Sequence, residues 1–172
     1  WSGGEVSRLL TPGTNPTAVM LLFVAWTCVV SVLPHLDLVH LVFNLYWLWA
    51  LGAVIETRCG SRRTLGIFLL CAMVSSSAEF AFGGLGFGLS GVVYGLFGIL
   101  LVRGQTDETL KLSRGTIQLF VFWFFLCIAL TMLQVWNIAN VAHGAGALAG
   151  MLVAWSMDAA TARRRLAGST LA

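Results

Sequence analysis

Charge is scarce in this sequence. Asp, Glu, Lys and Arg make up 10% of the 172 residues, whereas a soluble domain carries roughly 25%. Hydrophobic residues make up 58%, and a water-soluble fold of this length has too little interior to bury so many apolar side chains. The composition therefore excludes a soluble domain and predicts an integral membrane protein in contact with lipid. The net charge of +3 is too small to indicate nucleic-acid binding, and we expect none.

Paired cysteines, metal-binding spacings and repeats are also missing. The four cysteines follow no paired or metal-like spacing, and three of them lie within apolar runs, where a free cysteine acts as a small hydrophobic residue. They are Cys28, Cys59, Cys71 and Cys127. No internal repeat or low-complexity tract stands out. We therefore expect no disulfide bond, no metal site and no cofactor.

Six apolar segments make up most of the chain. They span about 17–33, 36–57, 64–82, 89–102, 116–136 and 141–158. Most of them approach the ~20 residues that a membrane-spanning helix needs. The sequence thus predicts an all-α membrane protein with six transmembrane helices in one domain, residues 16–160. Residues 1–15 are expected to form a flexible lead-in, and residues 161–172 a basic cytoplasmic tail.

The basic residues are distributed unevenly among the connections. All of them precede the first segment, follow the sixth, or lie in the second-to-third and fourth-to-fifth loops. They are Arg8, Arg58, Arg62, Arg63, Arg103, Lys111, Arg114, Arg163, Arg164 and Arg165. With six spans these four places share one side of the membrane, so the positive-inside rule puts both termini in the cytoplasm. In a bacterium, this multi-pass protein would lie in the inner, plasma membrane.

The fourth segment is too short to cross the bilayer. From Ser90 to Val102 it holds about 13 residues, which cover ~20 Å, whereas the hydrocarbon is ~30 Å thick. With Arg103 held at the cytoplasmic surface, Ser90 would lie ~10 Å below the outer surface. Non-helical backbone at that depth is tolerated only inside protein or beside water. We therefore expect a short, re-entering fourth helix and an outer cavity with Ser90 at its floor.

Two stripes of small residues predict a close helix pair. One consists of Gly88, Gly91, Gly95 and Gly98, and the other of His143, Gly146, Gly150 and Ala154. Spacings of three and four place each stripe on one helix face, and such faces let helix backbones approach closely. If the stripes pack with their starts level, Ser90 and His143 meet as a candidate nucleophile and base.

Further polar groups point to the same depth. His40 and Asn44 share a helix face and could donate hydrogen bonds to an oxyanion, which acyl transfer requires. Tyr94 could pack on the ring of His143. Because no acidic residue lies near Ser90 or His143 in the sequence, we expect a Ser–His dyad rather than a triad. Other interpretations are a back-bonded serine, glycines that serve packing alone, and an asparagine that joins helices.

At these residues the chain resembles the rhomboid family of intramembrane serine proteases. Residues 88–91 match the family's Gly-x-Ser-Gly motif, residues 142–150 its Ala-His-x-x-Gly-x-x-x-Gly motif, and residues 40–44 its His-x-x-x-Asn element. Residues 52–60 resemble its Gly-x-x-x-Glu-x-x-x-Gly element. Tyr94 also falls where the family places a tyrosine.

The resemblance implies a six-helix fold and cleavage of single-span transmembrane substrates by a Ser90–His143 dyad. It implies an oxyanion site formed by His40, Asn44 and the Ser90 backbone N–H. A rhombosortase-like branch of the family is compatible. The residues expected to pack around the site are Tyr94, Gly88, Gly91, Gly146 and Gly150.

The N-terminal quarter departs from the family pattern. Rhomboids usually have a long first outer loop with a Trp-Arg pair, but here Thr27 follows Trp26. Either the first loop is very short, or residues 17–33 are themselves that loop and a first span is missing. Two other functions stay open: an inactive rhomboid-like protein that binds membrane helices, and a small transporter or channel. The presence of Ser90 and His143 disfavours the former, and the lack of a charged midplane residue disfavours the latter.

Overall fold

The computed structural model describes residues 18–84 and 86–169, with side chains for 23–84 and 86–157. This part of the chain is helical and contains no strand, which confirms the predicted all-α class. The elements are α2 (Ala18–Val30), α3 (Leu38–Cys59), α4 (Ser61–Ala81), α5 (Ser90–Arg103), the 3₁₀ helix η1 (Glu108–Leu110), α6 (Arg114–Met132) and α7 (Asn140–Ser169). The predicted lead-in, residues 1–15, lies outside the described residues.

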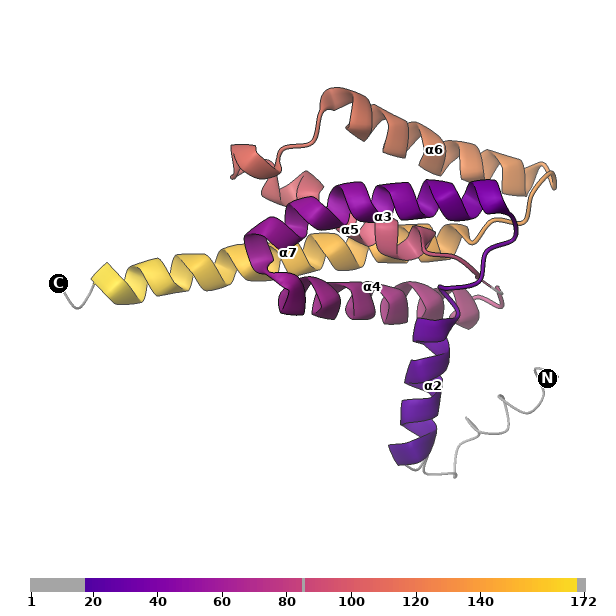
Figure 1. Ribbon diagram of the computed structural model, residues 1–172, viewed down its shortest axis with the longest axis horizontal. Coiled ribbons are helices and arrows are strands. Elements are labelled where there is room, and N and C mark those ends of the chain that lie inside the picture. Colours follow the sequence, from indigo (N-terminus) through magenta and orange to yellow (C-terminus); the bar gives the residue numbers. More distant parts are fainter. Residues whose placement is uncertain (1–17, 85, 170–172) are drawn as a thin grey trace.

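Helix α5 lies at the centre of the bundle, between α3, α4 and α7 (Figure 1). All of its residues from Gly91 to Leu100 are buried. A helix that is apolar on every side can be buried in this way, because it has no polar face to present. Helix α6 lies at the edge of the bundle and touches α7 only lightly. The innermost helix is therefore the one that carries Ser90.

The outer helices present apolar side chains to their surroundings. By length and composition, α3, α4 and α6 could each cross a membrane. Large apolar side chains stay exposed on all three, among them Trp49, Leu65 and Phe125. Exposed apolar area of this extent is typical of a surface in contact with lipid, in agreement with the predicted membrane protein.

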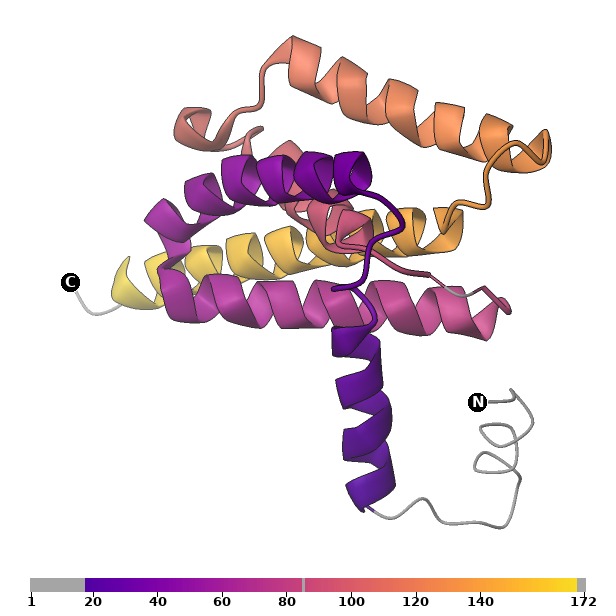
Figure 2. The ribbon, with the colours of Figure 1, turned by 45° about the vertical axis from the view of Figure 1, so that its right-hand side comes forward.

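Helix α2 does not run alongside the other helices. It points away from the bundle, from the side of α4, in both views (Figure 1 and Figure 2). Its 13 residues cover only ~20 Å, less than the ~30 Å hydrocarbon, because a turn and Pro34 follow it. The prediction that residues 17–33 form a transmembrane span is therefore not confirmed.

Two of the differences between the helix boundaries and the predicted segments are informative. Helix α4 begins at Ser61 rather than near residue 64, because Gly60 alone makes the turn from α3. Its φ of 78° is in the left-handed region, which glycine adopts without steric cost. Its N–H donates to the Glu56 carbonyl oxygen at 2.8 Å. Helix α7 continues to Ser169, so the predicted tail is largely helical.

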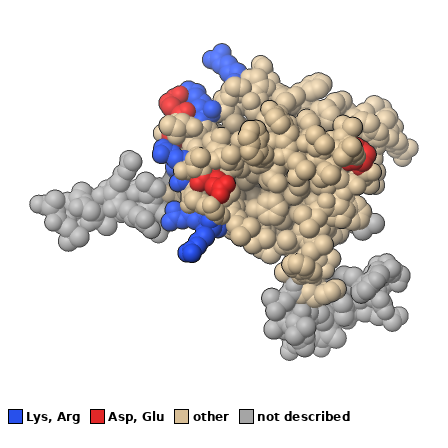
Figure 3. Space-filling model, in the orientation of Figure 1, with Lys and Arg blue, Asp and Glu red and all other residues tan. Residues whose placement is uncertain are grey.

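The basic residues whose side chains the structure describes gather at one end of the molecule, which we call the basic end (Figure 3). They are Arg58, Arg62, Arg63, Arg103, Lys111 and Arg114. They come from the end of α3, the start of α4, the end of α5 and the connection to α6. Ser90 opens α5 and so lies at the opposite end, which we call the Ser90 end. The folded chain therefore keeps the charge asymmetry that the loops predict.

Candidate active site

Ser90 is the first residue of α5, directly after a glycine-rich loop. Gly88 in that loop has a φ of 107°, a backbone angle that residues with a side chain rarely adopt. A Cβ atom on Gly88 would also lie 3.0 Å from Cε1 of His40. Glycine is therefore required here both by the backbone conformation and by the neighbouring ring. The turn ends at a half-buried Ser90 whose backbone N–H belongs to the unpaired first turn of a helix.

Helices α5 and α7 meet through the glycine seam, which we define as Gly91, Gly95, Gly146 and Gly150. A Cβ atom added at Gly146 would collide with the Gly91 carbonyl oxygen, and one at Gly150 with that of Gly95. In the other direction, a Cβ atom at Gly95 would lie 3.2 Å from the Gly146 oxygen. The two backbones thus touch without intervening side chains, as the stripes predict.

The seam brings Ser90 and His143 together. Nε2 of His143 lies 2.8 Å from Oγ of Ser90, within hydrogen-bond range. The His143 side chain is 3% exposed, so bulk water cannot compete for this nitrogen. Tyr94 stacks on its ring with centroids 4.7 Å apart and an angle of 28° between the planes. The Tyr94 hydroxyl donates to the Phe120 carbonyl oxygen at 3.1 Å, which holds the stacking ring in place.

The other ring nitrogen of His143 has no acidic partner. Within the described residues, Nδ1 is buried and makes no hydrogen bond to the protein. No carboxylate therefore orients the imidazole as the third member of a triad would. Its orientation comes from the stacked Tyr94 and from the backbone of α7.

His35 and His40 lie beside the loop that leads to Ser90. Their rings contact edge to face, with centroids 5.0 Å apart. Nδ1 of His35 lies 2.8 Å from the Leu33 carbonyl oxygen, so it carries the proton. Nε2 is then free to accept the Leu89 backbone N–H at 3.4 Å. His35 thus supports the residue before Ser90, a role that sequence spacing alone did not reveal.

Asn44 is buried, with 3% of its surface exposed. Its Nδ2 donates to the His40 carbonyl oxygen at 3.0 Å, which uses one of its two hydrogens. The sequence prediction that His40 and Asn44 share a face therefore agrees with the geometry. Asp37 caps their helix, because its Oδ1 accepts the His40 backbone N–H at 2.8 Å.

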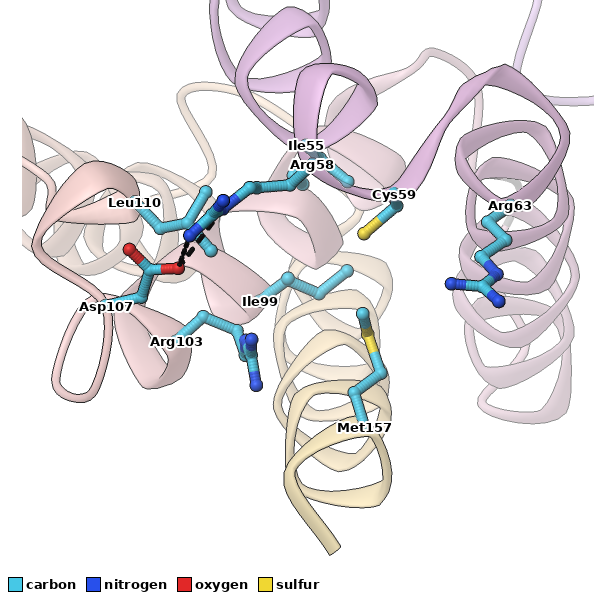
Figure 4. Close-up of a pocket in the computed structure, with 9 residues that line it drawn as sticks. All are labelled: Ile55, Arg58, Cys59, Arg63, Ile99, Arg103, Asp107, Leu110 and Met157. Atoms are coloured by element: carbon cyan, nitrogen blue, oxygen red, sulfur yellow. Dashed lines mark hydrogen bonds and ion pairs between the residues drawn. The ribbon is translucent and has the colours of Figure 1, made fainter. Parts of the chain in front are cut away.

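A cavity of about 250 Å³ lies at the basic end rather than near Ser90 (Figure 4). Arg58 and Arg103 are among the residues that line it, and Arg103 ends the same helix that Ser90 begins, ~20 Å away. Arg58 forms an ion pair with Asp107 there. The Thr109 hydroxyl and then the Arg58 guanidinium lower the pKa of Asp107 to about 2. This cavity is charged and remote, so it does not belong to the Ser90 site.

The site also contains an acidic residue to which the sequence alone assigned no role. Glu79 is 8% exposed, and its Oε2 accepts the Ala142 backbone N–H at 2.9 Å. The sequence signal was a single acidic residue within the otherwise uncharged second half of α4. Its partner lies 63 positions away, beyond the reach of any local pattern.

Comparison with known families agrees with this arrangement. The family model of the Rhomboid domain matches residues 23–159, a range that includes Ser90, His143, His40, Asn44 and Glu79. Rhomboid proteins are membrane proteins, and the family generally consists of intramembrane serine proteases. Because the match covers most of the sequence, the chain belongs to the rhomboid family.

Proposed function

We propose that this chain is an intramembrane serine protease that hydrolyses peptide bonds in or near transmembrane segments, with Ser90 as nucleophile and His143 as base. The observation that supports this most directly is the 2.8 Å approach of Nε2 of His143 to Oγ of Ser90. A nucleophile and base within ~2.6–3.2 Å of each other are the basic requirement for covalent acyl transfer.

The proposed reaction needs only these two side chains for proton transfer. As Ser90 Oγ attacks the substrate carbonyl carbon, its proton passes to Nε2 of His143. The imidazolium then gives that proton to the leaving amine, and the acyl group stays on Ser90. A water molecule attacks the acyl group in a second step, while His143 takes its proton and returns one to Ser90.

Three donors could stabilise the oxyanion that forms in each step. His40 lies against Gly88, the Ser90 backbone N–H opens a helix, and Asn44 retains a second Nδ2 hydrogen. Donors fixed before the reaction cost little reorganisation, which is why such groups lower the barrier. We propose that these residues form the oxyanion site.

The membrane arrangement that we propose runs from α3 to α7. The basic end lies at the cytoplasmic surface, and α5 begins inside the membrane at Ser90, because its 14 residues cover only ~21 Å. This gives a short, re-entering helix and an outer cavity above Ser90. The C-terminus is then cytoplasmic, and with α2 as a first span the predicted count of six and a cytoplasmic N-terminus follow.

We propose that the substrates are single-span membrane proteins. We also propose that lipid surrounds the exposed apolar surface. A substrate helix must unwind locally, because a helical peptide bond is hydrogen-bonded and shielded from Ser90. The alternative is an inactive rhomboid-like protein that binds membrane helices without cleaving them.

A fluorophosphonate serine probe distinguishes these functions. The protein in detergent should become labelled at Ser90 and should cleave a transmembrane peptide. Labelling should be lost in Ser90→Ala and strongly reduced in His143→Ala. A folded wild-type protein that is neither labelled nor active would support the inactive alternative and overturn the proposal.

A further inference from the structure

Helix α7 lacks a cap of its own. The carbonyl oxygen of Ala139 accepts the His143 N–H at 3.2 Å, so the helix starts at this point, but an alanine methyl group cannot accept a hydrogen bond from the first turn. The neighbouring Asn140 is turned away, since its Nδ2 donates to Thr131 Oγ1 at 2.8 Å. The first N–H groups of α7 therefore depend on an acceptor from elsewhere in the chain.

Glu79 supplies that acceptor from α4. Its Oε2 accepts the Ala142 N–H at 2.9 Å in a buried environment, one residue before His143. A negative group at a helix N-terminus is also favoured by the helix dipole. The carboxylate thus holds the backbone from which the His143 side chain extends.

The same carboxylate supports the loop that leads to Ser90. A Cβ atom on Gly84 would collide with Oε1 of Glu79, and one on Gly86 would lie 2.9 Å from its Cγ. The loop backbone therefore folds directly onto this side chain, which explains two glycines that no motif accounts for. Gly84 N–H also donates to the Glu79 backbone carbonyl oxygen at 3.0 Å.

We propose that Glu79 is a positioning residue for the reaction, and that it sets the distance between His143 and Ser90 by holding the backbone before each of them. This inference rests on the proposed proteolysis. Glu79 does not act as the acid of a triad, because Nδ1 of His143 has no hydrogen-bond partner among the described residues. The role requires an acceptor oxygen that reaches the Ala142 N–H. It does not require a group that accepts a proton from the imidazole.

Three substitutions at Glu79 distinguish the effect of side-chain length from the effect of side-chain charge. Glu79→Gln keeps an acceptor oxygen at the same reach, so kcat should stay within ~3-fold of wild type. Glu79→Asp keeps the charge but shortens the side chain, and Glu79→Ala removes the acceptor. Both should lower kcat ~10–100-fold with KM nearly unchanged, because ~1 Å of misplacement at reacting groups can cost ~10²-fold in rate.

The matched control is Ile67→Ala, a buried change in the same helix, ~18 Å away along α4. It should lower thermal stability in detergent without lowering the kcat of the folded fraction. Hydrogen exchange provides a readout that does not depend on activity. The amides of residues 141–143 should exchange at least ~10-fold faster in Glu79→Ala and Glu79→Asp than in wild type or Glu79→Gln.

Two results would overturn the positioning role. One is a Glu79→Gln variant that loses as much kcat as Glu79→Ala, and the other is amide protection at 141–143 that is equal in all variants. Should Glu79→Ala fail to fold, the contrast between Glu79→Gln and Glu79→Asp still decides. A wild-type protein with no cleavage but with the expected exchange pattern would remove the proposed proteolysis and leave the helix cap standing.

Discussion

The two ends of α5 are built on different physical principles. At the Ser90 end, His35 and Glu79 accept backbone N–H groups from distant parts of the chain, and His143 contacts the Ser90 hydroxyl. At the basic end, Arg58 pairs with Asp107, and Lys111 pairs with Glu108 at 2.8 Å. The Lys111 and Glu108 side chains are 58% and 80% exposed, so water screens their attraction.

This difference predicts which end tolerates change. Buried backbone contacts leave no free volume, so a single added carbon must move a helix. Exposed ion pairs are worth little and can be replaced by water. The Ser90 end should therefore control the chemistry, while the basic end should control orientation in the membrane.

The largest effect should come from the reacting side chains. Ser90→Ala and His143→Ala should each lower the cleavage rate on the order of 10⁴-fold or more, because nucleophile and base act as one unit. The double variant should be no slower than either single one. Cleavage of a fluorogenic transmembrane peptide in detergent measures all three. Substantial turnover by Ser90→Ala would mean that another group attacks the substrate.

The next largest effect should come from the glycine seam. Gly146→Val and Gly150→Val would drive a side chain into the carbonyl oxygens of Gly91 and Gly95. Overpacking of this kind costs ~1–3 kcal/mol, and the forced shift of α7 should lower kcat ~10²-fold or more. Cleavage rate and thermal stability should be measured together.

The matched control for the seam is Gly66→Val on α4, where an added Cβ atom meets nothing within 4 Å. Its activity should stay close to wild type. Gly104 cannot serve as a control, because a Cβ atom there would lie 2.8 Å from the Leu100 carbonyl oxygen. Equal losses at Gly66 and Gly146 would show that the seam does not set the Ser90–His143 distance.

Intermediate effects should follow the loss of oxyanion donors. His40→Ala should lower kcat by up to ~10²–10³-fold, the usual cost of one such donor. Asn44→Ala should cost less, since one of its hydrogens is already bonded to the His40 carbonyl oxygen. Steady-state kcat values with KM measured in parallel provide the test. If neither change affects kcat, other groups must stabilise the oxyanion.

The smallest effect should come from Asp107 at the basic end. Its folded pKa of about 2 lies below its ordinary value of 3.8, so the ionised form contributes stability that is complete above about pH 4 and is lost as the pH falls toward 2. Asp107→Asn should therefore shift the melting temperature by less than ~2 °C at neutral pH, with cleavage within ~2-fold. Melting curves from pH 7 to pH 3 for both proteins would test this, and a large loss at pH 6 would contradict it.

Much of this arrangement was accessible from the sequence. The periodic spacing of the glycines predicted a close pair of helices, and that pairing predicted that Ser90 and His143 meet. Helix positions followed from the apolar segments to within a few residues, except that α7 continues past the predicted end at residue 158 to Ser169. The orientation of α2 could not be predicted from the sequence. An apolar segment has the same composition whether it runs across the membrane or in another direction.

The sequence by itself determined that this protein is a membrane protein, that it is helical, and that its charges are unevenly placed. These properties depend on composition and local periodicity, which each segment carries on its own. Only the tertiary structure decided that Glu79 caps the helix of His143, and that His35 supports the backbone before Ser90. Those bonds join residues 63 and 54 positions apart. Their partners become neighbours only after the helices have packed, so no local pattern encodes them.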